Sequence, residues 1–374
     1  MNITLHMTNK CNLACDYCYV PKNTNEMNEE IIEQSIRYAM SDGSPTISIV
    51  FFGGEPLMEK PLIEHAIGIC RSIEKKGRHF FHLKISTNGT LLDEETLKFL
   101  KREQVLLSIS MDGNRSAHDT HRKFPDGNGS FDLVDEKASL ALEYHPYATA
   151  LSVITPQNAG YVCESSEYLL NKGFKYIISA PDFDSVWDEK SMSVLERQYR
   201  KLSKIYIEKT RDKKDFYLAP FEEKLASHIC GPYKKYERCE LGIKNVSIAP
   251  DGSIFPCIQF VYEDPGRWCI GDVWKGIDTA KREAIYTESE EEKESCTTCE
   301  VKGRCRNWCG CLNWHTTGNV NKVSPTVCAY ERMITPIADS IGNRLFKKRT
   351  PLFIDKFYNA AYPFLALFRE KKDI

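Results

Sequence analysis

The chain has 374 residues, of which 42% are hydrophobic and 27% are charged. This balance is typical of a globular protein with room for two domains, or for one large domain with an extension. The net charge of −2 excludes a global electrostatic attraction to nucleic acid or to an anionic membrane surface. The N-terminus has no signal-peptide pattern, and no apolar stretch is long enough to span a bilayer. We therefore expect a cytoplasmic protein without a membrane span and without a nucleic-acid partner.

The fifteen cysteines are too many to be read as disulfides in a cytoplasmic chain of this size, so they favour metal binding. Cys11, Cys15 and Cys18 follow the first predicted strand with the spacing C-x3-C-x2-C, and Tyr17 precedes the last of them. Three thiolates on one loop can hold three corners of a cubic iron–sulfur cluster and leave the fourth iron open for a ligand. The alternative is a structural zinc site, for which no fourth ligand is evident nearby.

Short apolar runs alternate with helical patterns through the first half of the chain. The predicted strands are 3–8, 47–52, 82–86, 105–110, 148–154 and 176–179. The predicted helices are 28–41, 61–76, 93–102, 131–144 and 162–172. Six β–α units in a row predict a parallel sheet with helices outside it. The cysteine loop would lie at the carboxyl ends of these parallel strands, where the active sites of (β/α) barrels are found.

Polar residues follow the other predicted strands. They are Gly53, Gly54, Glu55 and Pro56 after the second strand, Ser86 and Asn88 at the end of the third, and Ser110 and Asp112 at the end of the fourth, with Arg122 further on. The glycines would let the backbone approach a ligand closely, and the carboxylate could accept a hydrogen bond from an ammonium group. For Asn88 and Asp112, a turn-forming role at a strand end is the alternative to ligand contact.

The cysteine run resembles the signature of the radical S-adenosylmethionine (SAM) superfamily, and the four residues 53–56 resemble its GGEP motif. The resemblance implies a partial, six-unit (β/α) barrel similar to a TIM barrel, with a SAM-binding 4Fe–4S cluster on the three cysteines. An electron from that cluster would cleave SAM to a 5′-deoxyadenosyl radical, which abstracts a hydrogen atom from the substrate. Residues 53–56 would hold the SAM amino group, Ser110 and Arg122 would contact SAM, and Tyr17 would lie by the adenine. Arginine suits the SAM carboxylate because its planar fork matches that group.

A second group of cysteines lies in the C-terminal half. It consists of Cys239, Cys257, Cys296, Cys299, Cys305, Cys309 and Cys328. This pattern resembles the SPASM domain, named for its subtilosin, pyrroloquinoline quinone, anaerobic sulfatase and mycofactocin maturases. The resemblance implies two auxiliary 4Fe–4S clusters. The first would take Cys230, Cys239, Cys257 and Cys309, and the second would take Cys296, Cys299, Cys305 and Cys328. The alternatives are a pair of zinc sites, or a first auxiliary cluster with an open iron that Cys230 does not bind.

Four cysteines remain. We predict that Cys70 and Cys163 are buried small apolar residues, and that Cys269 and Cys311 lie near the clusters without binding them. The predicted domains are the barrel (1–220), the SPASM domain (221–333) and a helical extension (334–374). A polar stretch at 191–213 is predicted to be a solvated bridging helix.

The predicted extension has apolar residues at helical spacing. They are Phe353, Ile354, Phe357, Tyr358, Ala361, Phe364, Leu365 and Phe368, and Pro363 should kink or break the helix. We expect this extension to pack on the chain's own barrel. Docking of a partner or contact with a membrane surface are the alternatives.

Enzymes that resemble this chain mostly modify ribosomally made peptides or proteins, by thioether bonds, C–C or C–O cross-links, or oxidation of Cys or Ser to formylglycine. In anaerobic sulfatase maturases an aspartate directly follows the cysteine equivalent to Cys257 and acts as a base, whereas Ile258 stands here. We therefore predict oxidative cross-linking of a ribosomal peptide. Asp182 and Asp184, just past the sixth strand, are the candidate substrate-side residues. The alternatives are a sulfatase-type maturase, a radical SAM enzyme acting on a small molecule, and a non-catalytic iron–sulfur electron carrier.

The predicted first strand begins at about residue 3, so we expect no leader-binding domain ahead of the barrel. A separate protein would then bring the peptide, unless the barrel rim or the tail binds it directly. Reduction of the SAM-binding cluster would need an electron donor such as flavodoxin or ferredoxin. An exposed iron–sulfur edge is readily oxidised, which predicts oxygen sensitivity and an anaerobic host.

Overall fold

The computed structural model describes residues 1–77 and 79–362. Within these residues one sheet has the strand order β11-β10-β9-β8-β1-β2-β3-β4-β5-β6-β7. Its parallel part consists of β1 (Asn2–Thr8), β2 (Thr46–Gly53), β3 (Phe80–Thr87), β4 (Leu106–Ser110), β5 (Thr149–Ile154), β6 (Tyr176–Pro181) and β7 (Tyr217–Ala219). The predicted run of six parallel strands is confirmed, and the short strand β7 extends it beyond the sixth.

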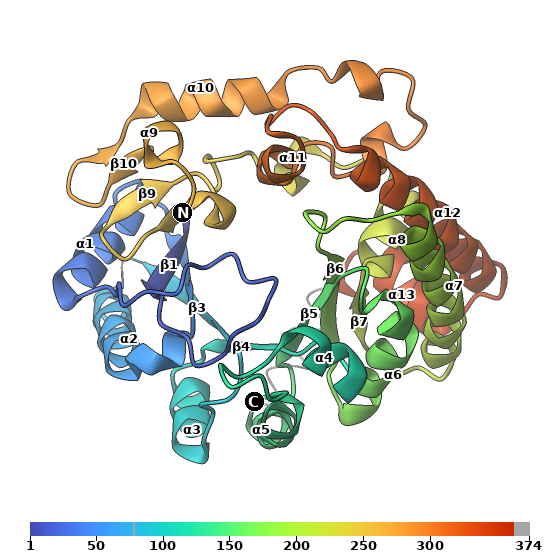
Figure 1. Cartoon of the computed structure of the whole chain (residues 1–374), viewed down its shortest axis with the longest axis horizontal. Coiled ribbons are helices and arrows are strands. Elements are labelled where there is room, and N and C mark those ends of the chain that lie inside the picture. The colour runs from blue at the N-terminus through green and yellow to red at the C-terminus, as the bar shows by residue number, and fades with distance from the viewer. Residues whose placement is uncertain (78, 363–374) are drawn as a thin grey trace.

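Helices cover the outside of this curved sheet (Figure 1). They are α1 (Glu29–Met40), α2 (Lys60–Glu74), α3 (Glu94–Arg102), α4 (Arg115–His121), α5 (Phe131–Tyr144), α6 (Val162–Lys172) and α7 (Glu189–Arg211). Local sequence explains their ends. The Asp93 side chain accepts a hydrogen bond from the Thr96 amide at 2.8 Å and caps α3. Gly173 ends α6 with a φ of +116°, a conformation that glycine adopts at little cost.

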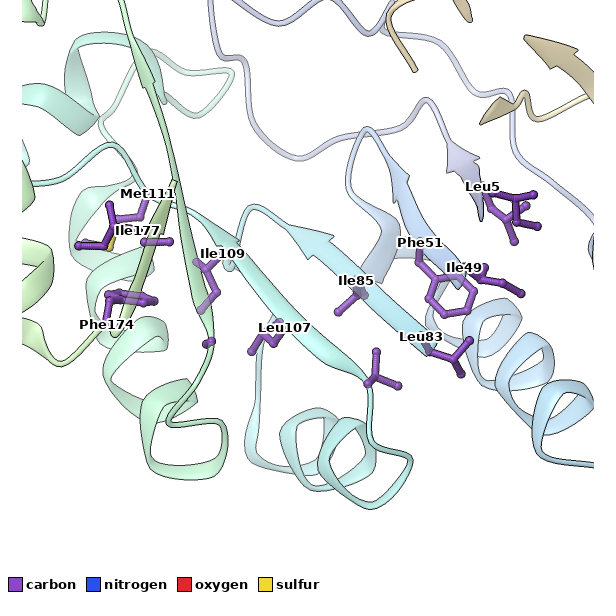
Figure 2. Close-up of a cluster of buried hydrophobic side chains, with 14 of the residues drawn as sticks. Leu5, Ile49, Phe51, Leu83, Ile85, Leu107, Ile109, Met111, Phe174 and Ile177 are labelled. Carbon is purple, nitrogen blue, oxygen red and sulfur yellow. The ribbon is translucent and has the colours of Figure 1, made fainter. Parts of the chain in front are cut away.

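The strands bury one row of side chains against these helices. Figure 2 shows residues of this row from neighbouring strands, among them Leu5, Phe51 and Ile109, each fully buried. Because side chains alternate across a strand, the residues between them face the inside of the curve. In β3, for example, the buried Leu83 and Ile85 alternate with the partly exposed Lys84 and Ser86. In β3 the inner face therefore carries polar groups, whereas the same face of β2 and β5 includes Val50, Phe52 and Leu151.

The cysteine-rich half lies between the two ends of the parallel sheet (Figure 1). It contains α8 (Phe221–Ile229), β8 (Asn245–Ile248), β9 (Ser253–Phe255), α9 (Pro265–Trp268), β10 (Gly271–Asp272), β11 (Gly276–Ile277), α10 (Thr279–Glu290) and α11 (Gly310–Thr317). Strand β8 pairs in parallel with β1, and β9, β10 and β11 continue from it as antiparallel strands. The barrel and the cysteine-rich half therefore share one sheet.

Helix α7 corrects the expectation of a solvated bridging helix. It buries Leu195, Tyr199, Leu202 and Tyr206 and packs against α6 and α12 (Pro325–Lys347). These apolar residues recur at three- and four-residue spacing in an otherwise charged helix, so that one face is buried although the average composition is polar.

The helical extension packs on the chain itself, as predicted. Helix α12 continues through the predicted boundary at 333/334, and α13 (Pro351–Tyr358) follows it. Phe353 is fully buried, and Lys356 Nζ donates a hydrogen bond to Glu222 Oε1 at 2.6 Å. The predicted kink at Pro363 and the positions of Phe364, Leu365 and Phe368 lie outside the described residues. Of the helices that the structure describes, none combines the length and the apolar character needed to cross a membrane.

Candidate active site

The loop that carries Cys11, Cys15 and Cys18 connects β1 to α1 and is anchored on the end of β2. The Gly54 amide donates to the Thr8 carbonyl at 2.7 Å, and the Glu55 amide donates to the Lys10 carbonyl at 2.8 Å. A Cβ atom on Gly54 would lie 2.2 Å from the Lys10 oxygen. These glycines therefore let the backbone of β2 approach the chain's own cysteine loop. From the sequence we had expected them to let the backbone approach a ligand.

Two donors point at the first thiol of this loop. The Leu13 amide lies 3.4 Å from Cys11 Sγ, and Asn88 Nδ2 lies 3.7 Å from it. Asn88 Nδ2 also donates to Asn12 Oδ1 at 2.9 Å, so that the end of β3 holds the cysteine loop. Burial raises the pKa of the Cys15 thiol to about 11. A thiolate at that position needs a bound cation to compensate its charge.

These contacts fit iron–sulfur ligation, because hydrogen bonds to the sulfurs are a normal feature of such sites. A cubic cluster holds its thiolates at separate corners, whereas a single metal ion gathers all its donors on one atom. Across residues 1–77 and 79–362, no three His, Cys, Asp or Glu side chains converge closely enough to hold a single ion.

The Glu55 carboxylate is completely buried. It accepts hydrogen bonds from Thr87 Oγ1 at 2.7 Å, from the Asn88 amide at 2.7 Å and from the Leu57 amide at 3.0 Å. Burial raises its pKa to about 7, against the opposing effect of these donors. The side chain that was expected to meet an ammonium group thus ties the end of β2 to the end of β3.

A second buried polar group joins the cysteine loop to β4. Arg122 donates to both oxygens of Asp112, from Nε at 3.0 Å and from a terminal nitrogen at 3.1 Å. The Tyr17 hydroxyl donates to the same carboxylate at 2.7 Å. The Val153 amide donates to it at 2.9 Å. Asp112 is therefore the centre of a network that includes three predicted cofactor residues. Ser110 ends β4 beside it, partly exposed on the inner face.

His121 is a residue that the sequence reasoning missed. Its Nδ1 lies 2.6 Å from Asp16 Oδ1, and its Nε2 lies 2.6 Å from Thr155 Oγ1. It therefore links the cysteine loop to the end of β5. Its position next to Arg122 was the available signal, but nothing in the local pattern distinguishes it from a surface histidine.

The C-terminal cysteines fall into two neighbourhoods. Burial, and then the thiols of Cys257 and Cys309, raise the pKa of Cys239 to about 12. Burial, and then Cys296, raise the pKa of Cys328, and Cys299 adds to this rise. Cys305 is buried near Cys328.

The remaining cysteines have other surroundings. Cys230 is exposed. Cys311 lies with its Sγ 3.5 Å from that of Cys309. Cys70 and Cys163 are buried in the core, as predicted. The ligand assignments stay predictions.

The two candidate aspartates after β6 have different surroundings. Asp182 accepts hydrogen bonds from the Asp184 amide at 3.1 Å and from Ser185 Oγ at 2.6 Å, so it forms the turn. Asp184 leaves that turn, and its Oδ2 lies 3.9 Å from Nδ1 of His315 on α11. The structure therefore brings Asp184, and not Asp182, to the cysteine-rich half.

Comparison with known proteins agrees with this geometry. Residues 5–169 match the model of the Radical SAM superfamily. The chain is 25% identical over 323 residues to a cysteine-type anaerobic sulfatase-maturating enzyme of Clostridium perfringens, covering 80% of this chain and 85% of that one. Its fold is similar to a solved structure of anSMEcpe with bound AdoMet and Cp18Cys peptide (TM-score 0.78, 22% identity, 92% of this chain and 100% of that one). It is also similar to Streptococcus suis SuiB bound to precursor peptide SuiA (TM-score 0.63, 16% identity, 87% of this chain and 75% of that one). The chain carries a radical SAM domain in residues 5–169, and this domain together with the maturase relatives supports a radical SAM oxidoreductase.

Proposed function

We propose that this enzyme oxidatively cross-links a ribosomally synthesised peptide through a thioether, C–C or C–O bond. The observation that carries the proposal is a hydrogen bond between the segment before Cys11 and the segment after Cys257. Tyr262, which follows Cys257 by a short segment, donates from its hydroxyl to Asn9 Oδ1 at 2.8 Å, just ahead of Cys11. An oxidation that removes two electrons from a substrate needs an electron acceptor near the place where the first hydrogen is abstracted. The contact supports such a proximity between the two predicted cluster regions.

The chain's own residues have distinct parts in this proposal. Cys11, Cys15 and Cys18 would hold the SAM-binding cluster, which supplies the 5′-deoxyadenosyl radical when SAM is bound. The auxiliary clusters would take the two predicted sets of cysteines. Tyr17, Ser86, Asn88, Ser110, Asp112, Arg122 and residues 53–56 would line the SAM site. The Arg122–Asp112 pair keeps the guanidinium buried and fixes its orientation.

The relatives favour a peptide or protein substrate, since one of them is a sulfatase maturase and two similar structures hold peptides. Ile258 at the position of the maturases' basic aspartate favours cross-linking over formylglycine formation. Sulfatase-type maturation remains the second candidate, because the curated relative covers 80% of the chain. A cytoplasmic location, a flavodoxin or ferredoxin as electron donor and a separate leader-binding protein complete the proposal.

The test is anaerobic. The enzyme is reconstituted with iron and sulfide, supplied with SAM and a strong reductant, and offered small peptides encoded beside its gene. A product lighter by two hydrogen atoms per event, formed in step with deoxyadenosine, supports the proposal. Deoxyadenosine without any change in peptide mass refutes a peptide substrate.

The matched variant is Cys15→Ala. It should abolish SAM cleavage and leave the signals of the auxiliary clusters in electron paramagnetic resonance. Cleavage that survives this change would show that the loop does not hold the SAM-binding cluster.

A further inference from the structure

Three titratable side chains from separate parts of the chain converge beside the barrel mouth. Asp184 comes from the loop after β6, His315 from α11, and Glu263 from the segment that follows the short helix η4 (Ile258–Phe260). His315 Nδ1 lies 3.9 Å from Asp184 Oδ2 and 3.8 Å from Glu263 Oε1. Figure 1 shows the loop after β6 reaching toward α11. Parallel strands of this kind of sheet end at the active-site side, so the group lies where a substrate would enter.

The hydrogen bonds of His315 determine which of its nitrogens is basic. Its Nε2 lies 3.1 Å from the carbonyl oxygen of Gln259. A carbonyl only accepts, so Nε2 carries the hydrogen and donates it. In the neutral ring Nδ1 is then the nitrogen with the free lone pair, and it faces the two carboxylates. A proton taken up at Nδ1 would convert an unfavourable arrangement of three acceptors into an attraction between one cation and two anions.

The surrounding residues hold this arrangement in place. The Phe260 ring stacks on the His315 ring with centroids 5.9 Å apart, and Trp314 Nε1 donates to Glu263 Oε2 at 3.3 Å. The turn formed by Asp182 fixes the backbone of Asp184. Burial raises the pKa of the Asp184 carboxyl; His315 opposes this rise, and Asp182 and Glu263 add to it.

The place of the group in the sequence is also informative. The Gln259 carbonyl that orients His315 belongs to the residue directly after Ile258. Ile258 occupies the position at which the related sulfatase maturases would carry their basic aspartate. The His315 ring thus binds the backbone of the residue that directly follows position 258. Asp184 is half-exposed, with 51% of its side chain accessible, so solvent or substrate can reach the group.

We propose that His315, oriented by Gln259 and flanked by Asp184 and Glu263, accepts the proton that the peptide substrate loses during oxidation. The inference rests on the proposed function. For a thioether, the carbon loses a hydrogen atom to the 5′-deoxyadenosyl radical, and the thiol loses its proton to His315 Nδ1. The C–S bond would then form, and an auxiliary iron–sulfur cluster held by the predicted cysteines would take up one electron. The substrate thus loses two hydrogens and two electrons in total.

The test compares His315→Gln with His65→Gln. His65 on α2 also faces a carboxylate, with its Nε2 3.8 Å from Glu33 Oε1, but it lies on the outer helices. General-base catalysis contributes about 10²–10⁴-fold. We therefore expect His315→Gln to reduce cross-linked product about a hundredfold while deoxyadenosine formation changes less than about twofold. The wild type and His65→Gln should keep the two products in step. The Asp184→Asn variant, altered at a half-exposed position, should show the same uncoupling to a smaller degree.

Two further readouts separate catalysis from structure. The visible spectrum of the iron–sulfur clusters should match that of the wild type, and added imidazole should restore part of the product in His315→Gln. Product that stays in step with deoxyadenosine in both His315→Gln and Asp184→Asn would overturn the inference. A wild-type enzyme that cleaves SAM but changes no peptide would instead overturn the proposed function, and this inference with it.

Discussion

Arg122 donates two hydrogen bonds to Asp112, and both side chains are shielded from solvent, with 8% and 0% of their surfaces accessible. A planar guanidinium and a carboxylate are well matched in this geometry. Removing one partner of a buried pair leaves an uncompensated charge, which makes such a pair costly to break.

The first prediction follows from this pair. Asp112→Asn should lower the free energy of unfolding by about 3–5 kcal/mol, because the buried guanidinium would lose its counter-charge. Urea unfolding of the anaerobic, cluster-loaded enzyme, followed by circular dichroism, measures the change. Asp132→Asn is the control, since it removes the exposed partner of Arg115 and should leave the midpoint almost unchanged. Equal midpoints for the two variants would contradict the prediction.

The second prediction concerns the anchoring of the cysteine loop. A methyl group on Gly54 would overlap the Lys10 carbonyl, so Gly54→Ala should displace the loop. SAM cleavage should fall about a hundredfold, the loss expected for a displacement of about 1 Å at a reacting centre, while the auxiliary-cluster signals persist. Gly68→Ala is the control, because nothing lies within 4 Å of a Cβ at that helical position. Cleavage at the wild-type rate in Gly54→Ala would show that the loop tolerates the displacement.

The third prediction concerns pH. Burial raises the pKa of Glu55 to about 7, above the value of about 4.3 for an exposed glutamate. The folded state therefore holds this proton more tightly than the unfolded chain does. The resulting stabilisation is fully present below about pH 4.3, falls as the pH rises and is lost above about pH 7. It amounts to about 4 kcal/mol at most. Glu55→Gln cannot ionise, so its urea midpoint should vary less between pH 5 and 7 than that of the wild type. Parallel pH curves for the two proteins would refute the shift.

The fourth prediction tests the junction of α8 with α12. Lys224 Nζ lies 2.5 Å from Glu331 Oε2, and both side chains are completely buried. Lys224→Met should destabilise the protein by about 3–5 kcal/mol, because Glu331 would remain charged without its partner. The double variant Lys224→Met/Glu331→Leu should recover most of the loss. Lys60→Met, which breaks exposed pairs, should have little effect. A double variant as unstable as Lys224→Met would indicate that packing, not charge, decides this site.

Much of the first half could be predicted from local signals. Alternating strands and helices carry their own boundaries, such as the cap at Asp93 and the left-handed Gly173. Cysteine spacing is also a local signal, so the candidate ligands could be identified before the fold was known. The partners of Glu55 and Asp112 could not, because they lie on other strands and just after α4. The group at His315 joins residues far apart in the sequence, and only the fold brings them together.

The pairing of β8 with β1 has a consequence for how the molecule is made. Asn2 of β1 pairs with Asn245 of β8, so β1 is synthesised more than two hundred residues before its partner on this side. Until then, the side of β1 away from β2 exposes unpaired backbone groups, which can recruit strands from other chains. A nascent chain that has not yet reached β8 would therefore expose an unpaired strand edge, prone to aggregation, next to the loop that carries Cys11, Cys15 and Cys18.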